Sequence, residues 1–520
     1  MEQFTNRDIS AALAYHEATK HSYTSVRHGA HFLDWSNRPL PYKIYPGAGT
    51  LALPRDLSLP ATPTLSALKR RSGFSQRSFD LETVAKLLFC AGGLTKRANV
   101  GGEDYHFRAA ASAGALYPVE IYLVASEVEG LEPGLYHFLP ADMKLHGLRR
   151  GDWRPYLARC AGKTSLHRAR AVLILTSIFW RSAWKYRARA YRYCFWDTGT
   201  ILANLLAVAN ADALDTEIIA AFQDRPLEQL LEVDGDREGI SCIVALSELA
   251  PSSSGVQNDE GEIHSNTDEF PILSPTGLES IPLSPKEEVF EDLISLHRAS
   301  RLSSSAEVSV MKDVRFEPVQ LDSSSARVTF HVLDDNASAG LGETILRRGS
   351  SRIFAQTPIA AEELATILAA SSRRADSDLI DGVETYIIVN AVDGVASGTY
   401  FYESNHGELE PLKTGDFRSE AGYLCLEQPL GADCSALIIY MTDLQRVLRT
   451  FGNRGYRNAH LEAGLSGGRA YLVAYSLGRG ATGLTFYDDD TTSFLQPHCG
   501  QMSPLLMVAV GEPKTRRGDG

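Results

Sequence analysis

The chain has 520 residues, of which 44% are hydrophobic and 22% charged, and its formal net charge is −13. This length corresponds to roughly two to four globular domains, and the composition excludes a wholly disordered or coiled-coil chain. An acidic balance argues against a general nucleic-acid binder, and no apolar run reaches the ~18–20 residues that a bilayer span needs. The polar start MEQFTNRDIS does not resemble a signal peptide, and seven scattered cysteines predict reduced thiols in a cytoplasmic protein.

The segment from Pro251 to about Pro285 is rich in Ser, Asn, Asp, Glu and Gly and has no apolar periodicity, which is typical of a linker. It divides the chain into nearly equal halves and so prompts a search for an internal repeat. The boundaries that follow are an N-terminal extension (1–65), a first copy (66–250), the linker (251–286) and a second copy (287–520).

Four ordered blocks support the repeat. YPVEIYLVASEVEGLEPGLYHF (117–138) matches 381–402 at a spacing of 264, RAYRYCFWDTG (189–199) matches 454–464 at 265, and CIVALSE (242–248) matches 506–512 at 264. FSQRSF (74–79) aligns with GSSRIF (349–354) at 275, which requires a net difference of eleven residues in loops. We interpret the chain as two copies of one domain.

Each copy shows the same order of predicted elements. A helix that carries early arginines is expected to continue through 81–91 or 360–371, where apolar residues recur with helical spacing. Strands follow, then a second long helix and a closing strand. Because these elements do not form regular βαβ units, the pattern predicts an α+β fold with a mixed or antiparallel sheet flanked by helices, rather than a dinucleotide-binding fold. The expected strands are 119–125, 134–140, 171–180 and 240–248, and 383–391, 398–403, 435–443 and 503–511; the long helices are 198–212 and 462–478.

Three motifs in the second copy are misleading. GRGATG (478–483) spells G-x-G-x-x-G, but a helix precedes it and a strand follows, so close packing is the better interpretation. GLSGG (464–468) lies at the start of a helix and is not a nucleophile elbow. Asp488, Asp489 and Asp490 are interpreted as a solvated acidic turn, and no metal site is predicted.

The most specific stretch is SAGALYP within Arg108 to Val124. Together with YHEATK near the N-terminus and KYRARAYRY at 185–193, it resembles the SagB-type dehydrogenases, FMN-dependent members of the nitroreductase-like superfamily. Known members of that family oxidise thiazolines and oxazolines in peptides to thiazoles and oxazoles. The resemblance covers 15–248 and continues more weakly through 297–511.

The resemblance implies that the two nitroreductase-like copies pack as an intrachain pseudo-dimer with FMN at their interface. One copy supplies a cradle for the phosphate and a glycine-rich turn under the flavin ring, and the other supplies a covering loop and a catalytic lysine–tyrosine pair. The implied cradle residues are Arg348, Gly349, Ser350, Arg352, Gly483, Leu484, Thr485, Lys514 and Arg516; the covering residues are Ser112, Ala113, Gly114 and Leu116; the catalytic residues are Lys185 and Tyr186.

The two copies have lost complementary parts of this set. At the spacing of 275, Gly73 stands where Arg348 is expected, and the first copy has no glycine from Ala211 to Phe222. The second copy has Asp376-Ser377-Asp378 in place of the covering loop, where carboxylates without a partner would be costly, and Thr450-Phe451 in place of the lysine–tyrosine pair. One composite site is therefore expected, with its cradle from the second copy and its lid from the first.

Aromatising an azoline removes a proton from a ring carbon and a hydride, which the family passes to flavin N5 before oxygen reoxidises the cofactor. Lys185 can serve as the base if desolvation and nearby cations lower its pKa, and Arg187, Arg189 and Arg192 are the expected cations. Tyr186 is expected to relay the proton or hold the substrate.

Two other functions remain open: an NAD(P)H-dependent nitro or quinone reductase with the same flavin, and a non-catalytic scaffold in a biosynthetic complex. The substrate could be a heterocycle in a peptide, on a carrier or in a small molecule, and a cyclodehydratase is a candidate partner. No nucleic acid or membrane partner is expected.

Overall fold

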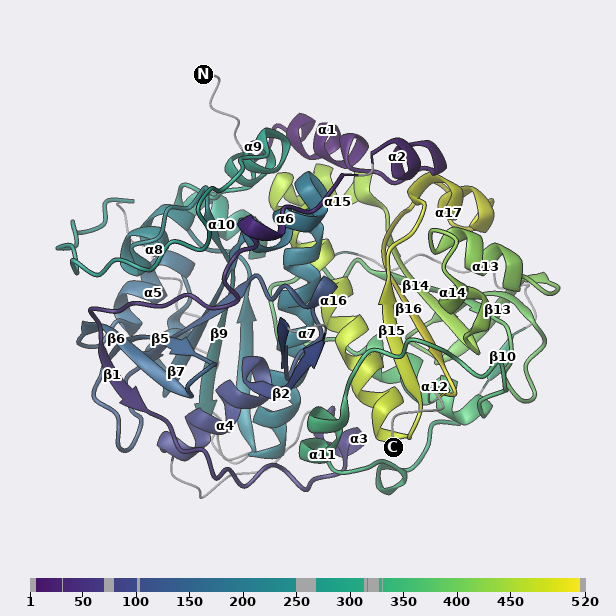
Figure 1. Cartoon of the computed structure of the whole chain (residues 1–520), viewed down its shortest axis with the longest axis horizontal. Helices are drawn as coiled ribbons and strands as arrows, with labels where there is room; N and C mark the ends of the chain where they lie inside the picture. The colour runs from purple at the N-terminus through teal and green to yellow at the C-terminus, as the bar shows by residue number, and fades with distance from the viewer. Residues whose placement is uncertain are drawn as a thin grey trace.

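The computed structural model describes residues 6–29, 31–69, 79–100, 103–248, 268–312, 316, 327–329 and 331–514. They form two seven-stranded antiparallel sheets with the same topology, and two long helices lie between the sheets (Figure 1). This arrangement confirms the predicted α+β fold with two copies. Within the described residues, no helix is long and apolar enough to cross a membrane.

Each sheet repeats one strand order. In the first copy it is β1 (Gly49–Ala52), β6 (Lys144–Arg150), β5 (Gly134–Leu139), β4 (Val119–Ala125), β7 (Ala171–Ile178), β9 (Glu238–Glu248) and β8 (Leu214–Ile219). In the second it is β10 (Val328–Thr329), β13 (Glu408–Thr414), β12 (Gly398–Glu403), β11 (Glu384–Val389), β14 (Ala436–Thr442), β16 (Ser503–Gly511) and β15 (Gly480–Leu484). The central strands β4, β7, β11 and β14 are buried throughout or nearly so, and they are rich in the β-branched and aromatic side chains that suit a covered sheet.

The helices also correspond. The first copy holds α3 (Thr64–Ala67), α4 (Leu81–Gly92), α5 (Arg154–Ala161), α6 (Phe179–Tyr186), α7 (Ala190–Ala211) and α8 (Asp224–Leu231). The second holds α11 (Leu341–Arg347), α12 (Ala361–Ser371), α13 (Arg418–Leu424), α14 (Pro429–Asp433), α15 (Leu444–Phe451), α16 (Asn453–Ser476) and α17 (Asp488–Leu495). The expected helix through the early arginines of the second copy is wrong: α11 ends at Arg347, and residues 348–360 are not helical. Gly349 stands two residues after this end, and glycine disfavours the interior of a helix.

The long helices α7 and α16 cross in direct backbone contact at two equivalent glycines. A Cβ atom on Gly199 would lie 2.5 Å from the carbonyl oxygen of Leu461, and one on Gly464 would lie 2.5 Å from that of Trp196. Both distances are shorter than van der Waals contact, so only glycine allows this approach. The GLSGG motif therefore serves helix packing, and the two copies share one continuous core.

The N-terminal extension packs on both copies, and part of it runs beside the described end of the predicted linker and the helices that follow. Helix α1 (Ser10–Ala18) packs on α9 (Glu291–Ala299), while α2 (Tyr23–His28) and α10 (Ser305–Lys312) lie further along these two segments. Leu40 N–H donates to the carbonyl of Leu283 at 2.7 Å, and Ile281 N–H donates to that of Ile44 at 2.9 Å. The extension is therefore part of the fold and not an appended tail.

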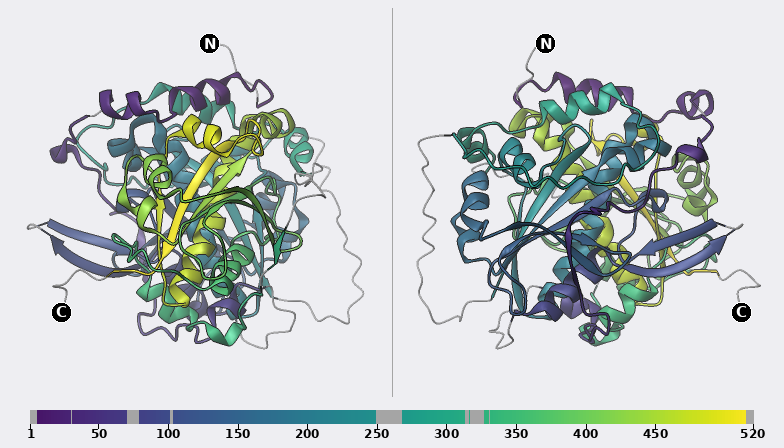
Figure 2. Two further views of the ribbon diagram at one scale, coloured as in Figure 1. Left: turned by 90° about the vertical axis from the view of Figure 1, so that its right-hand side faces the viewer. Right: turned by 60° about the vertical axis from the view of Figure 1, so that its left-hand side comes forward.

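The length difference between the copies lies in a hairpin that only the first copy has. Strands β2 (Leu94–Val100) and β3 (Glu103–Arg108) form a two-stranded ribbon that projects from the body (Figure 2). Equivalent hydrogen bonds, from Glu129 N–H to the carbonyl of Phe79 and from Asp393 N–H to that of Ile359, align Phe79 with Ile359. The spacing there is 280, so the ungapped match at 275 is wrong; Gly73 itself falls outside the described residues.

Candidate active site between the two copies

The covering loop and the lysine–tyrosine pair of the first copy meet at Gly114. Lys185 and Tyr186 end α6, and Gly114 lies in the short helix η2 (Ala113–Ala115) with a φ of 65°. A Cβ atom at Gly114 would lie 2.6 Å from Tyr186 Oη and 3.2 Å from Lys185 Nζ. Glycine is thus required both by the left-handed backbone and by the close approach of two polar groups. Leu116, which follows η2, is buried beneath the loop.

Asp197 of α7 holds the covering loop from below. Ser112 Oγ donates to Asp197 Oδ2 at 2.5 Å, and Ala113 N–H donates to Oδ1 at 3.0 Å. Burial raises the pKa of this carboxyl to about 7. Asp197 was not among the predicted site residues, although a single acidic residue within an apolar helix indicates a buried functional carboxyl. Glu462 stands at the equivalent position of the second copy.

The cradle segment of the second copy reaches across to the base of the hairpin. Arg348 Nε and Nη2 donate to the carbonyls of Ala109 and Arg108, each at 2.9 Å, and burial lowers the pKa of the guanidinium. Lys514 N–H donates to the carbonyl of Ile353 at 3.1 Å, which brings the C-terminal basic residue beside the cradle. Gly349, Ser350 and Arg352 lie in the same non-helical segment, and Arg516 is outside the described residues.

Strand β15 forms the floor of the site. Gly483 is exposed, its N–H donates to Tyr471 Oη, and Leu484 beside it is buried. A Cβ atom at Gly480 would collide with Ser351 Oγ, which explains a second glycine of the GRGATG motif. Thr485 follows the strand, and its Oγ1 accepts a hydrogen bond from Tyr193 Oη of the first copy at 3.3 Å. This bond joins the floor to the lid.

The environment of Lys185 lowers its pKa, first through burial and second through the positive charge of Arg352 on the other copy. The prediction that Arg189 and Arg192 lower this pKa is wrong, because both side chains are paired with Asp488. Tyr186 packs against Tyr193 with ring centroids 4.5 Å apart, and burial raises the pKa of its hydroxyl far above the ordinary value. The pair thus combines a lysine that is easier to deprotonate with a neutral tyrosine.

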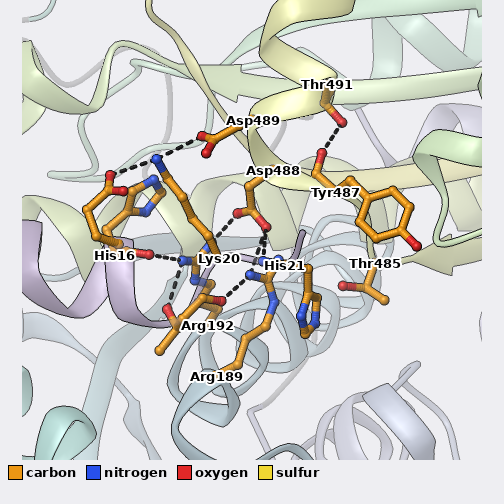
Figure 3. Close-up of polar contacts among 12 residues, drawn as sticks. His16, Lys20, His21, Arg189, Arg192, Thr485, Tyr487, Asp488, Asp489 and Thr491 are labelled. Atoms are coloured by element: carbon orange, nitrogen blue, oxygen red, sulfur yellow. Dashed lines mark hydrogen bonds and ion pairs between the residues drawn. The ribbon is translucent and has the colours of Figure 1, made fainter. Parts of the chain in front are cut away.

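Asp488 lies at the start of α17 and is buried, which corrects the prediction of a solvated acidic turn (Figure 3). Its Oδ2 accepts from Arg189 Nη1 at 2.9 Å and its Oδ1 from Arg192 Nη1 at 2.8 Å. Asp489 binds Lys20 at 2.8 Å. The sequence showed three acids in a row but gave no sign that the first faces two buried arginines.

The opposite composite site is closed. There the loop of the second copy bonds to strand β8, since Ile218 N–H donates to the carbonyl of Asp376 at 2.9 Å. Asp378 Oδ1 and Oδ2 accept from the backbone N–H groups of Ala220 and Ala221 at 2.5 and 3.1 Å. The expectation that these carboxylates lack a partner is wrong for Asp378, which stands at the position equivalent to Gly114 and binds the backbone that follows β8.

The open site suits a phosphorylated flavin. In the part of the chain that the structure describes, Arg348, Arg352 and Lys514 form no ion pair with a carboxylate. Two adjacent segments of the second copy therefore carry three cations that are available to an anion. Guanidinium groups favour phosphate because their fork matches its oxygens. On the floor strand Gly483 is the exposed residue, and Gly114 on the lid is exposed as well, so backbone without a side chain is accessible on both copies.

Comparison with known proteins identifies the class. The nitroreductase family model matches residues 68–247 and 345–512, which is more than half of the chain and covers both copies. The chain therefore belongs to the nitroreductase family and is an oxidoreductase of that kind, a family that generally uses FMN.

Three relatives are informative. A crystal structure from Anabaena variabilis, named as a nitroreductase, is 26% identical and superimposes with a TM-score of 0.77 over 97% of this chain and 100% of its own. MJ1384 of Methanocaldococcus jannaschii, also named as a nitroreductase, is 28% identical over 34% of this chain and 94% of its own length. The microcin B17-processing protein McbC of Escherichia coli is 28% identical over 24% of this chain and 47% of its own length.

Proposed function

We propose that this protein is an FMN-dependent dehydrogenase of the SagB type that oxidises azoline rings to azoles in natural-product or modified-peptide biosynthesis. The observation that carries the proposal is the convergence of Lys185, Tyr186 and Gly114 opposite Arg352 and the floor of the other copy. A nitroreductase that only accepts electrons from a nicotinamide has no evident need for a desolvated lysine–tyrosine pair at this place.

In this proposal residues of both copies bind the cofactor. Arg348, Arg352 and Lys514 would bind the phosphate, Gly483 to Thr485 would lie under the ring, and Ser112 to Leu116 would cover it. When bound, FMN supplies the acceptor for the two electrons that leave the azoline. The site residues then need only to orient the substrate, exclude water and remove the proton.

Lys185 is the base in this proposal. Its Nζ takes the proton from the ring carbon, for which the amine must first be neutral. Desolvation favours the neutral form, and Arg352 adds to this effect in the flavin-free protein, where no phosphate pairs with its charge. Tyr186 Oη lies next to Gly114 and remains protonated, so it can donate a hydrogen bond to the heterocycle. Tyr193 supports the Tyr186 ring from behind.

The similarity to McbC supports a peptide substrate, since that relative processes microcin B17. An azoline arises by cyclodehydration of a serine, threonine or cysteine side chain onto the preceding carbonyl. A cyclodehydratase partner would therefore supply the substrate, and the product would be the aromatic ring.

The test mixes the flavin-loaded protein with a synthetic azoline peptide in the absence of oxygen. Reduction of the bound flavin is monitored by the decrease in flavin absorbance. We expect the wild-type protein to react and the Lys185→Ala and Tyr186→Phe variants to retain flavin but react about 100- to 10,000-fold more slowly, as for removal of a general base. Thr450→Ala, at the position equivalent to Lys185 in the second copy, is the matched control and should react normally.

Two results would overturn the proposal. If NAD(P)H reduces the flavin far faster than any azoline and Lys185→Ala has no effect, the protein is a nitro or quinone reductase. If the purified chain binds no flavin at all, the scaffold function takes its place.

A further inference from the structure

Asp488 connects three segments that surround the candidate site (Figure 3). It belongs to the second copy, its carboxylate binds Arg189 and Arg192 of the first copy, and its Oδ2 also accepts the N–H of His21 from the N-terminal extension at 2.8 Å. The side chains of Asp488, Arg189 and Arg192 are only 1%, 4% and 0% exposed. Removing the carboxylate would leave both buried guanidinium groups without a counter-charge, which is strongly destabilising.

The N-terminal extension completes the cluster. Arg192 Nη2 donates to the carbonyl of His16 at 2.9 Å and to Thr19 Oγ1 at 2.8 Å. Tyr15 Oη donates to the carbonyl of Ala188 at 2.6 Å. Ala188 lies in η4 (Arg187–Arg189), the short helix that directly follows Lys185 and Tyr186.

Both sides of the site lie within one helical turn of this cluster. Only two residues separate Tyr186 from Arg189 on the lid, and only two separate Thr485 from Asp488 on the floor. The guanidinium of Arg189 also lies 5.4 Å from the centroid of the Phe486 ring, next to Thr485. A shift of the cluster would therefore move the lysine–tyrosine pair relative to the floor.

The second copy carries the same cluster at the closed site. Asp224 Oδ2 accepts from Arg454 Nη1 at 2.8 Å and its Oδ1 from Arg457 Nη1 at 3.2 Å, with all three side chains at most 1% exposed. Here the flanking residues are Phe451 and Ala221, and Asp378 accepts the N–H of Ala221 at the floor. The two clusters have the same chemistry and burial, and only one of them adjoins the lysine–tyrosine pair.

We propose that Asp488 is a positioning residue for Lys185 in the reaction proposed above, on which this inference rests. It acts through Arg189 and Arg192 by pressing the end of α6 and η4 against the second copy. That contact keeps water away from the amine of Lys185 and keeps Arg352 close to it. Asp224 has only a structural role.

The charged groups around Lys185 determine in which direction its pKa changes when the cluster loosens. Lys185 is faced by Arg352 and by the ring of Tyr186, and Asp488 is faced by Arg189, Arg192 and His21. If the cluster loosens, water reaches Lys185 and Arg352 moves away, so its pKa rises towards the ordinary lysine value. A direct electrostatic effect of removing one negative charge would lower that pKa instead.

The experiment compares Asp488→Asn with Asp224→Asn in the full chain. The pH dependence of Lys185 acylation, read by mass spectrometry on flavin-free protein, reports the pKa of this amine without any turnover. Azoline-dependent flavin reduction, flavin content and the melting temperature are measured alongside. We expect Asp488→Asn to raise the acylation midpoint by about 0.5–1 pH unit and to slow flavin reduction by about 10- to 100-fold at saturating substrate, as for a displaced catalytic group.

Asp224→Asn should lower the melting temperature by about as much as Asp488→Asn does, but it should leave the acylation midpoint of Lys185 and the rate of flavin reduction unchanged. If Asp488→Asn does not fold, Thr19→Val and its counterpart Ser300→Ala weaken the two clusters more gently and should show the same contrast. An unchanged midpoint with Asp488→Asn, or equal effects of both variants, would overturn the positioning role. Failure of the proposed reaction is recognised separately, because wild-type protein would then not react with azoline although the midpoint still moves.

Discussion

Arg348 is the predicted phosphate-binding arginine of the cradle, and in the structure its side chain also contacts the other copy. Its guanidinium is drawn into the interface, where it donates to the backbone carbonyls of Arg108 and Ala109. Carbonyl oxygens carry only partial charge, so these bonds do not neutralise the cation, and burial accordingly lowers its pKa. An arriving phosphate would supply the missing negative charge.

Replacing Arg348 should therefore weaken flavin binding more than it weakens the fold. A charge-assisted contact contributes about 1.5–3 kcal/mol, so we expect Arg348→Ala to raise the dissociation constant of FMN by about 10- to 100-fold. Quenching of flavin fluorescence on titration into flavin-free protein measures this. Arg374→Ala removes an arginine whose side chain is 62% exposed and should bind normally. Unchanged affinity in the Arg348 variant would show that the cradle lies elsewhere.

At the scale of elements, the site depends on how closely α7 and α16 approach. Lys185 precedes α7, while Tyr471 at the floor belongs to α16, so the crossing of these helices sets the distance between lid and floor. Gly199 and Gly464 are the two points where backbone meets backbone. Any residue other than glycine at either point would force the two helices apart.

Gly199→Ala should separate the helices and destabilise the chain. Forcing one methyl group into a packed interior costs about 1–3 kcal/mol, which would lower the melting temperature by several degrees. Gly49→Ala is the control, because a Cβ atom there meets nothing within 4 Å. Calorimetry of the two variants at one pH gives the comparison, and equal melting temperatures would show that the interface adapts.

The sequence predicted the elements better than their contacts. Four of the seven strands in each sheet, and the repeat itself, followed from apolar patterning, which the chain carries once in each copy. The remaining strands, β1, β6, β8, β10, β13 and β15, were not among the expected ones. The role of Asp488 could not be predicted, because its two arginines lie almost 300 residues away and no local pattern records such a distance. The helix expected through Arg348 ends one residue earlier, because Gly349 disfavours a helix interior and was not weighed in the prediction. Arg352 was missed as the cation near Lys185 because that contact exists only between copies.

At the scale of the whole molecule, two nearly equivalent interfaces have become different. In one, Asp376 and Asp378 bond the covering loop of the second copy to strand β8 of the first. In the other, the N–H of Gly483 is bound within its own copy by Tyr471, and the floor remains exposed. A chain that carries both copies can specialise each interface separately, which two identical subunits cannot do.

This asymmetry predicts one FMN per chain. The closed interface has a carboxylate in the position next to the strand, and a carboxylate repels a flavin phosphate or a reduced flavin ring in the same dry space. Flavin released by heat, divided by the protein concentration from amino-acid analysis, should give a ratio close to one in protein reconstituted with excess FMN. Arg348→Ala should bring that ratio towards zero, since the variant weakens the single open site and no second site replaces it. A ratio of two in the reconstituted wild-type protein would show that Asp378 leaves the second interface when flavin binds, and the division of labour between the copies would then be wrong.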